Sequence, residues 1–456
     1  MEIVSPPPSN PNGRRPTRVS EAGDTAGKVR LLPALALVVA SMIGTGVFTS
    51  LGFQVRDLSS GPAILLLWLL GGLLALCGAF SYAELIGAVP RSGGEYRFLS
   101  RLFHPSLGWA AGLLSLVIGF AAPAALAALA LGSYAHRACD ALPARGVAAV
   151  ALGIATLAHL RSVRTSARFQ TVTTLLKLAL IVGFIVAAFA TTGHGDIRWT
   201  PVWREDLRLV MQPPFAVSLL FVFYAYSGWN AAVYIADEVE HARRTIMLAL
   251  VGGTLLVTAL YLLLNAAFLK AAPIDELAGV VEVGHVAVQA LYGPQAAICF
   301  SALLSVGLLA TVSALVWAGP RVLAAIGKDL PALGALAVLN RGGVPVRATL
   351  LVAGLALGFV AIGNFEKILT FTQSGLTLCS MLTVAGVFRV RYLKLSPAGA
   401  FRCPWYPLPP LVFIGMSLAV LGWSLVGSPL ATAAGFATCF LAWALYFPLA
   451  KLQSRP

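Results

Sequence analysis

The sequence predicts an all-α polytopic membrane protein with about twelve transmembrane helices. Its 456 residues are 58% hydrophobic and only 11% charged, whereas soluble domains carry roughly 25% charged residues. The mean hydropathy is +0.84, and apolar runs of about 20 residues, long enough to span a bilayer, recur along the chain. This composition excludes a set of soluble domains, which the length alone would allow.

The apolar runs give the expected helices in chain order. A polar, proline-rich stretch with "SPPPSNPNGRRP" comes first, and we interpret residues 1–30 as a disordered cytoplasmic tail. The expected spans are residues 31–51, 62–89, 106–135, 146–161, 169–191, 214–236, 246–270, 294–318, 346–363, 367–388, 408–427 and 430–450. Two connections are longer than turns: 90–105 predicts a short interfacial helix, and 273–293 predicts an amphipathic external segment.

Lysine and arginine residues orient the chain. Of the 32, we place 23 on the side of the N-terminus and eight on the other side, and Lys177 lies inside an apolar segment. Basic residues favour cytoplasmic loops, so both termini are expected in the cytoplasm, with the protein in the plasma membrane. The net charge of +14 is therefore attributed to topology, and no nucleic-acid partner is expected.

Two of the predicted helices carry interruptions. "SMIGTGVFTS" (41–50) places two glycines near the middle of the first span, and "FVFYAYSGWNAAVYIADE" (221–238) has a polar, aromatic centre in the sixth. Glycine pairs also serve close helix packing, but interruptions at corresponding places in two halves indicate an inverted repeat. We therefore predict a 5+5 repeat, residues 31–191 and 214–388, with helices 1 and 6 discontinuous and with two additional helices in 408–450.

Several motifs together resemble the amino acid–polyamine–organocation (APC) superfamily, on the leucine-transporter fold. They are "IGTGVF", "SYAELIGAVPRSGGEYRF", "FYAYSGWN", "DEVEHARRTI", "GPRVLAAIGKDLP" and "RGGVPVRATL". The resemblance covers most of residues 31–390 and implies an amino acid permease that works by alternating access, with an amino acid substrate and the lipid bilayer as partners.

A zwitterionic substrate needs donors for its carboxylate and acceptors for its ammonium. A break in the first helix exposes N–H groups at the positive end of its outer half, and a break in the sixth exposes carbonyl groups. The resemblance implies a substrate site in which one set of residues holds the carboxylate, another holds the amine, and Gly228 lies at the second break. The two sets are Ile43, Gly44, Thr45 and Gly46 for the carboxylate, and Tyr224, Ala225 and Ser227 for the amine.

Lys177 is a lysine inside a predicted span. Insertion of a lysine at the centre of a membrane helix costs roughly 2.5–3.5 kcal/mol. Its side chain therefore either extends to the membrane surface or has a functional role. The resemblance implies that its ammonium replaces the sodium ion of coupled relatives, between helices 1 and 8. We expect it to contact the Ile43 carbonyl and a hydroxyl such as Ser305 or Ser313, and to release a proton during transport, since burial disfavours the charged amine.

The predicted spans lack other functional groups. The six cysteines show no CxxC spacing and the six histidines no metal-ligand pattern, so we expect no metal, no cofactor and no enzyme activity. Glu84 is expected to pair with an inner-loop arginine, and a part in closing an inner gate is the alternative. Spans 3, 8 and 10 carry no acidic residue, which favours neutral substrates, and Lys177 in the place of the sodium ion favours sodium-independent proton symport or exchange. The alternatives are a polyamine or cationic amino acid antiporter and a transport-inactive sensor; the oligomeric state stays open.

Overall fold

The computed structural model describes residues 29–161, 164–329, 333–340 and 343–453. Most of the predicted tail, 1–30, lies outside the described residues. Within them the secondary structure is helical, apart from two isolated β-bridges, Val29 with Val239 and Ser60 with Arg198.

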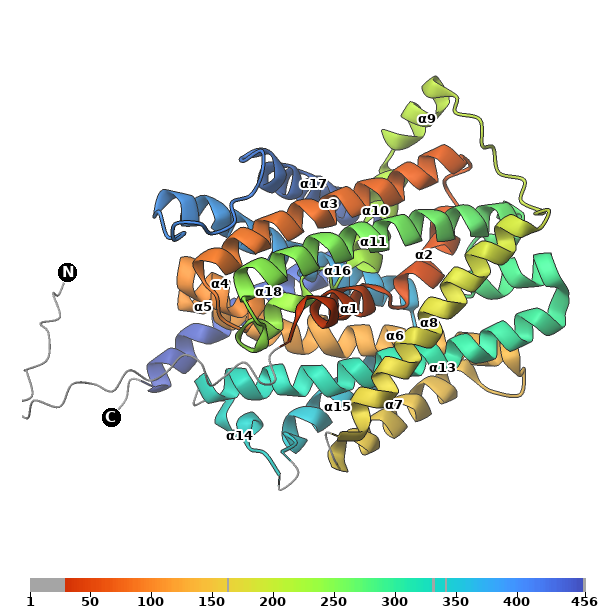
Figure 1. The fold of residues 1–456 in the computed structure, drawn as a ribbon. Helices are drawn as coiled ribbons and strands as arrows, with labels where there is room; N and C mark the ends of the chain where they lie inside the picture. The colour runs from red at the N-terminus through yellow and green to blue at the C-terminus, as the bar shows by residue number, and fades with distance from the viewer. Residues whose placement is uncertain (1–28, 162–163, 330–332, 341–342, 454–456) are drawn as a thin grey trace, which may run out of the picture.

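Each predicted span coincides with one helix or with two or three consecutive helices (Figure 1). The long helices and their partners are α1 (Leu31–Met42), α2 (Gly46–Gln54), α3 (Gly61–Ala88), α5 (Pro105–Leu114), η1 (Ser115–Ala121), α6 (Ala122–Ala138), α7 (Ala144–Arg161), α8 (Arg164–Ala190), α10 (Pro213–Tyr226), η2 (Ala231–Glu238), α11 (Ala242–Ala271), α13 (Val283–Asp329), α15 (Val346–Ile362), α16 (Phe365–Tyr392), α17 (Leu408–Gly427) and α18 (Pro429–Gln453). The short helices are α4 (Gly94–Leu102), α9 (Trp203–Val210), α12 (Ile274–Leu277) and α14 (Gly334–Ala337).

The chain is a multi-pass membrane protein. Among the described residues, nine helical stretches are long and apolar enough to cross a bilayer. Three further apolar helices are shorter, Ala144–Leu160, Leu175–Ala190 and Val346–Ile362. The total of twelve spans and the 5+5 repeat remain predictions.

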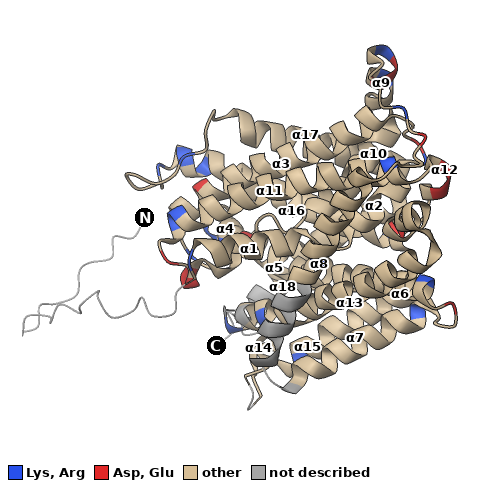
Figure 2. Cartoon of the chain, turned by 45° about the vertical axis from the view of Figure 1, so that its right-hand side comes forward, with Lys and Arg blue, Asp and Glu red and all other residues tan. Residues whose placement is uncertain are grey.

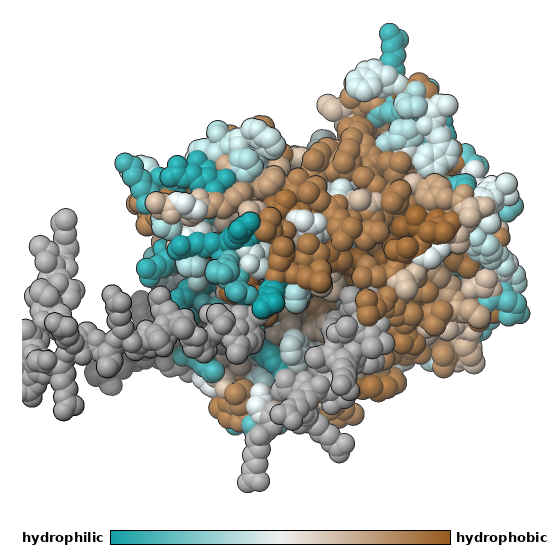
Figure 3. All heavy atoms as spheres, viewed as in Figure 1, coloured by the Kyte–Doolittle hydropathy of each residue, from teal (hydrophilic) through white to brown (hydrophobic). Residues whose placement is uncertain are grey.

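Charged and apolar residues are segregated along the bundle. Lysine, arginine, aspartate and glutamate gather at its two ends, and the middle is almost free of them (Figure 2). One face of the molecule shows a broad apolar area between hydrophilic margins (Figure 3). A charge-free middle is what a bilayer core requires, because it cannot solvate charged groups.

The connections that were expected to be structured are helical. The interfacial helix predicted in 90–105 is α4, and the external segment predicted in 273–293 contains α12 and the start of α13. α13 is bent at Gly293, where φ is 81°. The Gly279 N–H donates to the Gly52 carbonyl at 2.7 Å, which places this segment over the end of α2.

Candidate functional site

The first span leaves helical geometry between α1 and α2. Ile43 has φ −75° and ψ 77°, and the Gly44 N–H donates to the Met42 carbonyl at 2.8 Å, which together form an inverse γ-turn. Thr45 follows as the N-cap of α2, without a side-chain cap. Within the described residues, the N–H groups of Thr45, Gly46 and Val47 have no hydrogen-bond acceptor. These donors are available to a ligand.

The sixth span is interrupted between α10 and η2. The Ser227 N–H and hydroxyl both donate to the Tyr224 carbonyl, at 3.0 and 2.7 Å, and close the end of α10. Gly228 then takes a φ of 97°, a left-handed conformation that favours glycine. A Cβ atom there would lie 2.7 Å from the Ser41 carbonyl oxygen, so the turn also requires glycine because of its close approach to α1.

The two breaks lie against each other inside the bundle. The Thr45 and Tyr224 hydroxyls are 3.3 Å apart. A Cβ atom on Gly46 would lie 2.5 Å from the Cα atom of Ala225, so α2 and α10 touch through their backbones. Thr45 and Tyr224 are buried. The structure therefore brings the predicted carboxylate-binding and amine-binding segments side by side in the interior of the bundle.

The two predicted glycines of the first break have different surroundings. Gly46 is pressed against Ala225, as described above. Among the described residues, a Cβ atom on Gly44 would have only the Met42 carbonyl oxygen within 4 Å, at 3.9 Å. Helix packing therefore explains Gly46, whereas Gly44 borders open space beside the free N–H groups.

Tyr261 of α11 joins the two breaks, and sequence reasoning missed it. Its buried hydroxyl lies 2.6 Å from the Met42 carbonyl oxygen and 3.0 Å from that of Ala225. Because a phenol has one proton, it donates to one of these carbonyls at a time. Its ring packs against the rings of Trp68 and Tyr226. Two of the carbonyls expected to hold the amine, Tyr224 and Ala225, thus already have donors within the protein.

Lys177 of α8 connects the first break to α13. Its ammonium donates to the Ile43 carbonyl at 2.9 Å and to the Thr311 hydroxyl at 3.0 Å. The residue is 1% exposed, so its head group ends inside the protein rather than at the membrane surface. The aliphatic stem passes Gly307, where a Cβ atom would lie 2.8 Å from the lysine Cγ atom.

The hydroxyl partner of Lys177 is not one of the two expected from the sequence. The Ser305 hydroxyl donates to the Ser301 carbonyl at 2.8 Å, and the Ser313 hydroxyl pairs with His159 Nε2 at 2.8 Å. Thr311 and Gly307 are four residues apart on α13 and therefore share a face, which is the signal that identifies them once Lys177 is placed.

Glu84 has a separate, structural environment. The Arg391 guanidinium donates to both of its carboxylate oxygens, at 2.6 and 2.9 Å, and the Cys403 N–H donates at 2.7 Å. Its arginine therefore comes from the end of α16. Within the described residues, no group of three histidine, cysteine or acidic side chains is placed to hold a metal ion.

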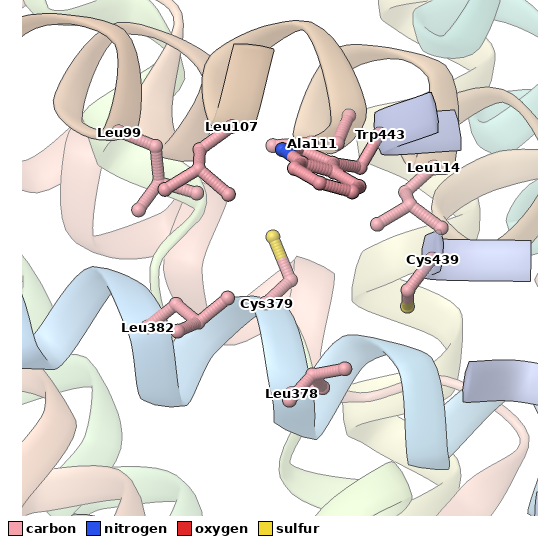
Figure 4. A pocket seen from close by; sticks show the side chains of 10 residues that line it. Leu99, Leu107, Ala111, Leu114, Leu378, Cys379, Leu382, Cys439 and Trp443 are labelled. Atoms are coloured by element: carbon pink, nitrogen blue, oxygen red, sulfur yellow. The ribbon is translucent and has the colours of Figure 1, made fainter. Parts of the chain in front are cut away.

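A small apolar pocket lies elsewhere, between α4, α5, α16 and α18. Its lining includes Leu107, Leu378, Cys379, Cys439 and Trp443 (Figure 4). None of its lining residues belongs to the two breaks, so it is separate from the site described above.

Comparison with known proteins gives one family and several relatives. Residues 30–454 match the family model described as "Amino acid permease". The chain is 25% identical to the human cystine/glutamate transporter, over 98% of this chain and 91% of that protein. It is 26% identical to a serine/threonine exchanger of Bacillus subtilis (strain 168), over 88% and 91%. It is 25% identical to the human large neutral amino acids transporter small subunit 2, over 98% and 86%.

Proposed function

Because the chain belongs to the amino acid permease family, we propose that it is a secondary transporter of neutral amino acids that works by alternating access. It is placed in the plasma membrane with both termini in the cytoplasm. Transport is independent of sodium and proceeds by proton symport or by exchange. The family consists of permeases rather than enzymes, and the chemistry of the site is that of binding.

The observation that carries this proposal is the contact between the two helix breaks. The N–H groups of Thr45, Gly46 and Val47 at the start of α2 have no acceptor in the part of the chain that the structure describes, and the helix dipole there favours an anion. The carbonyl end of α10 lies directly beside them, since a Cβ atom on Gly46 would lie 2.5 Å from the Ala225 Cα atom and the Thr45 and Tyr224 hydroxyls are 3.3 Å apart. The carboxylate and the ammonium of an α-amino acid, both bonded to its Cα atom, fit this pair of opposite helix ends.

The buried charges favour a neutral side chain on the substrate. Among the described residues, the buried acidic side chains are Glu84 and Glu95. Glu84 is paired with Arg391, and Glu95 accepts hydrogen bonds from Tyr82, Asn230 and Tyr234. A cationic substrate side chain would therefore find no uncommitted buried carboxylate among the described residues, and its burial would carry a large desolvation cost.

Lys177 supports the sodium-independent mechanism. Its ammonium already binds the Ile43 carbonyl at the break and the Thr311 hydroxyl of α13. The fixed ammonium of Lys177 in this position serves in place of a bound sodium ion. Loss of a proton from this ammonium during transport would remove a donor and weaken the connection between α1 and α13.

Uptake into proteoliposomes tests the proposal. The panel contains serine, threonine, leucine, lysine, arginine and a polyamine, each with and without sodium, with and without an imposed pH gradient, and with empty or preloaded vesicles. We expect saturable uptake of neutral amino acids in sodium-free buffer, stimulated by the pH gradient or by preloading. Selective uptake of lysine, arginine or the polyamine would support the antiporter alternative, and an absolute sodium requirement would contradict the role of Lys177.

A further inference from the structure

Glu95 is a buried carboxylate near the start of α4, in the "RSGGEY" motif. It is 8% exposed. Its Oε1 atom accepts from the Tyr82 hydroxyl at 2.9 Å and from Asn230 Nδ2 at 2.5 Å, and its Oε2 atom accepts from the Tyr234 hydroxyl at 2.7 Å. One carboxylate therefore collects three donors from three parts of the chain: α3, the turn after Gly228, and η2.

The two glycines before Glu95 allow its carboxylate to come close to Tyr234. Gly93 and Gly94 have φ values of 119° and 52°, which residues other than glycine rarely adopt. A Cβ atom on Gly94 would lie 2.5 Å from Cε1 of the Tyr234 ring. The glycine pair thus places Glu95 under η2 and leaves room for the tyrosine that binds it.

The carboxylate depends on neutral donors. Within the described parts of the chain, no lysine, arginine or histidine nitrogen lies within 4 Å of Glu95. Hydrogen bonds to a charged acceptor are roughly twice as strong as neutral ones, and a buried carboxylate without donors is strongly disfavoured. The cluster is therefore stable only while η2 stays in place.

The donors come from the segment directly after the second break. Asn230 and Tyr234 follow Gly228, and the same segment has two further attachments. Asp237 exchanges hydrogen bonds with Ser92 at 2.8 and 3.2 Å, and the Val29 N–H donates to the Glu238 carbonyl at 2.8 Å. Both attachments run to the end of the bundle where the described part of the chain begins.

We propose that Glu95 is a positioning residue that holds the segment Asn230–Glu238 closed beneath the substrate site. In the topology proposed above this is the cytoplasmic side, and the cluster must separate for the substrate to leave in that direction. The inference rests on the proposed function, because alternating access requires that the inner half of the broken helix move. The charge of Glu95 sets how strongly the closed position is held.

Labelling of a single cysteine tests the inference. Ala231→Cys places a reporter at the start of η2, in a background without the six native cysteines. Purified protein in vesicles is treated with a membrane-impermeant maleimide on the cytoplasmic face, without substrate. With Glu95→Gln we expect labelling about fivefold faster, as when one charge-assisted hydrogen bond becomes neutral. Tyr234→Phe, which removes one donor and keeps the carboxylate, should act in the same direction.

Glu238→Gln is the matched control, because this exposed glutamate is on the same segment and its side chain is outside the cluster. It should leave the labelling rate unchanged. Unchanged labelling in folded Glu95→Gln and Tyr234→Phe protein would overturn the inference, as would an equal increase in the control. The readout needs no transport, so the failure of this inference is distinguishable from the failure of the proposed function, which the uptake panel reports.

Discussion

At the scale of single residues, the two glycines of the first break are expected to respond differently to substitution. Gly44→Leu adds a side chain where the nearest neighbour of a Cβ atom is 3.9 Å away, so the protein should fold and lose substrate binding. Gly46→Leu forces α2 from the Ala225 backbone, and overpacking of this kind costs about 1–3 kcal/mol or more. Calorimetric binding and thermal melting in detergent, measured on both variants, check this.

An equal decrease in the midpoint of thermal unfolding for both variants would show that Gly44 is also a packing residue. Retained binding in Gly44→Leu would place the substrate carboxylate elsewhere than at the free N–H groups of Thr45, Gly46 and Val47.

Lys177 gives the second residue-scale prediction. Lys177→Ala removes the hydrogen bonds of an ammonium to the Ile43 carbonyl and the Thr311 hydroxyl. Hydrogen bonds to charged groups contribute roughly 1.5–3 kcal/mol, so uptake driven by a pH gradient should fall about tenfold or more while the protein still inserts. Initial uptake rates in sodium-free proteoliposomes, at several external pH values, measure the effect.

Lys270→Ala is the matched control for that experiment. Lys270 at the end of α11 also donates to backbone carbonyls, those of Ala188 and Thr191, but it lies away from the breaks. Its removal should leave the pH response intact. A Lys177→Ala protein that is as active and as pH-responsive as the wild type would remove Lys177 from the coupling mechanism.

At the scale of the helices, hydropathy and glycine content located the spans and both interruptions, because each is a local property of the sequence. The contacts of Tyr261, Thr311 and Glu95 are not local. Tyr261 lies in an ordinary apolar run, and its role depends on two carbonyls, of Met42 and Ala225, that are freed elsewhere in the chain. Such residues become visible only when the broken helices are placed side by side.

Tyr261→Phe tests whether α11 holds the two broken helices together. The substitution keeps the ring and leaves the buried Ala225 carbonyl without its hydroxyl donor, which costs about 1–3 kcal/mol. The midpoint of thermal unfolding in detergent should fall. Tyr292→Phe is the control, since the exposed Tyr292 hydroxyl donates to the Ala187 carbonyl at 2.8 Å near the surface; equal midpoints for the two variants would contradict the bridging role.

At the scale of the whole molecule, charge decides orientation. Charged residues gather at the two ends of the bundle (Figure 2), and we assign 23 of the 32 lysines and arginines to one end and eight to the other. Because the more basic end stays in the cytoplasm, the connection between α6 and α7 should face outward and the connection between α16 and α17 should face inward.

Cys139 and an introduced cysteine test this orientation in intact cells. Cys139 is exposed and lies just after α6, and Ala398 is exposed between α16 and α17. In protein with Cys139 as its only cysteine, a membrane-impermeant maleimide should react without permeabilisation. With Ala398→Cys as the only cysteine, the reagent should react only after the membrane is opened. The reverse labelling pattern would show that the protein has the opposite orientation in the membrane. The α2 end of the first break would then lie in the inward half of the first span. The cluster around Glu95 would in that case close the outer side of the site.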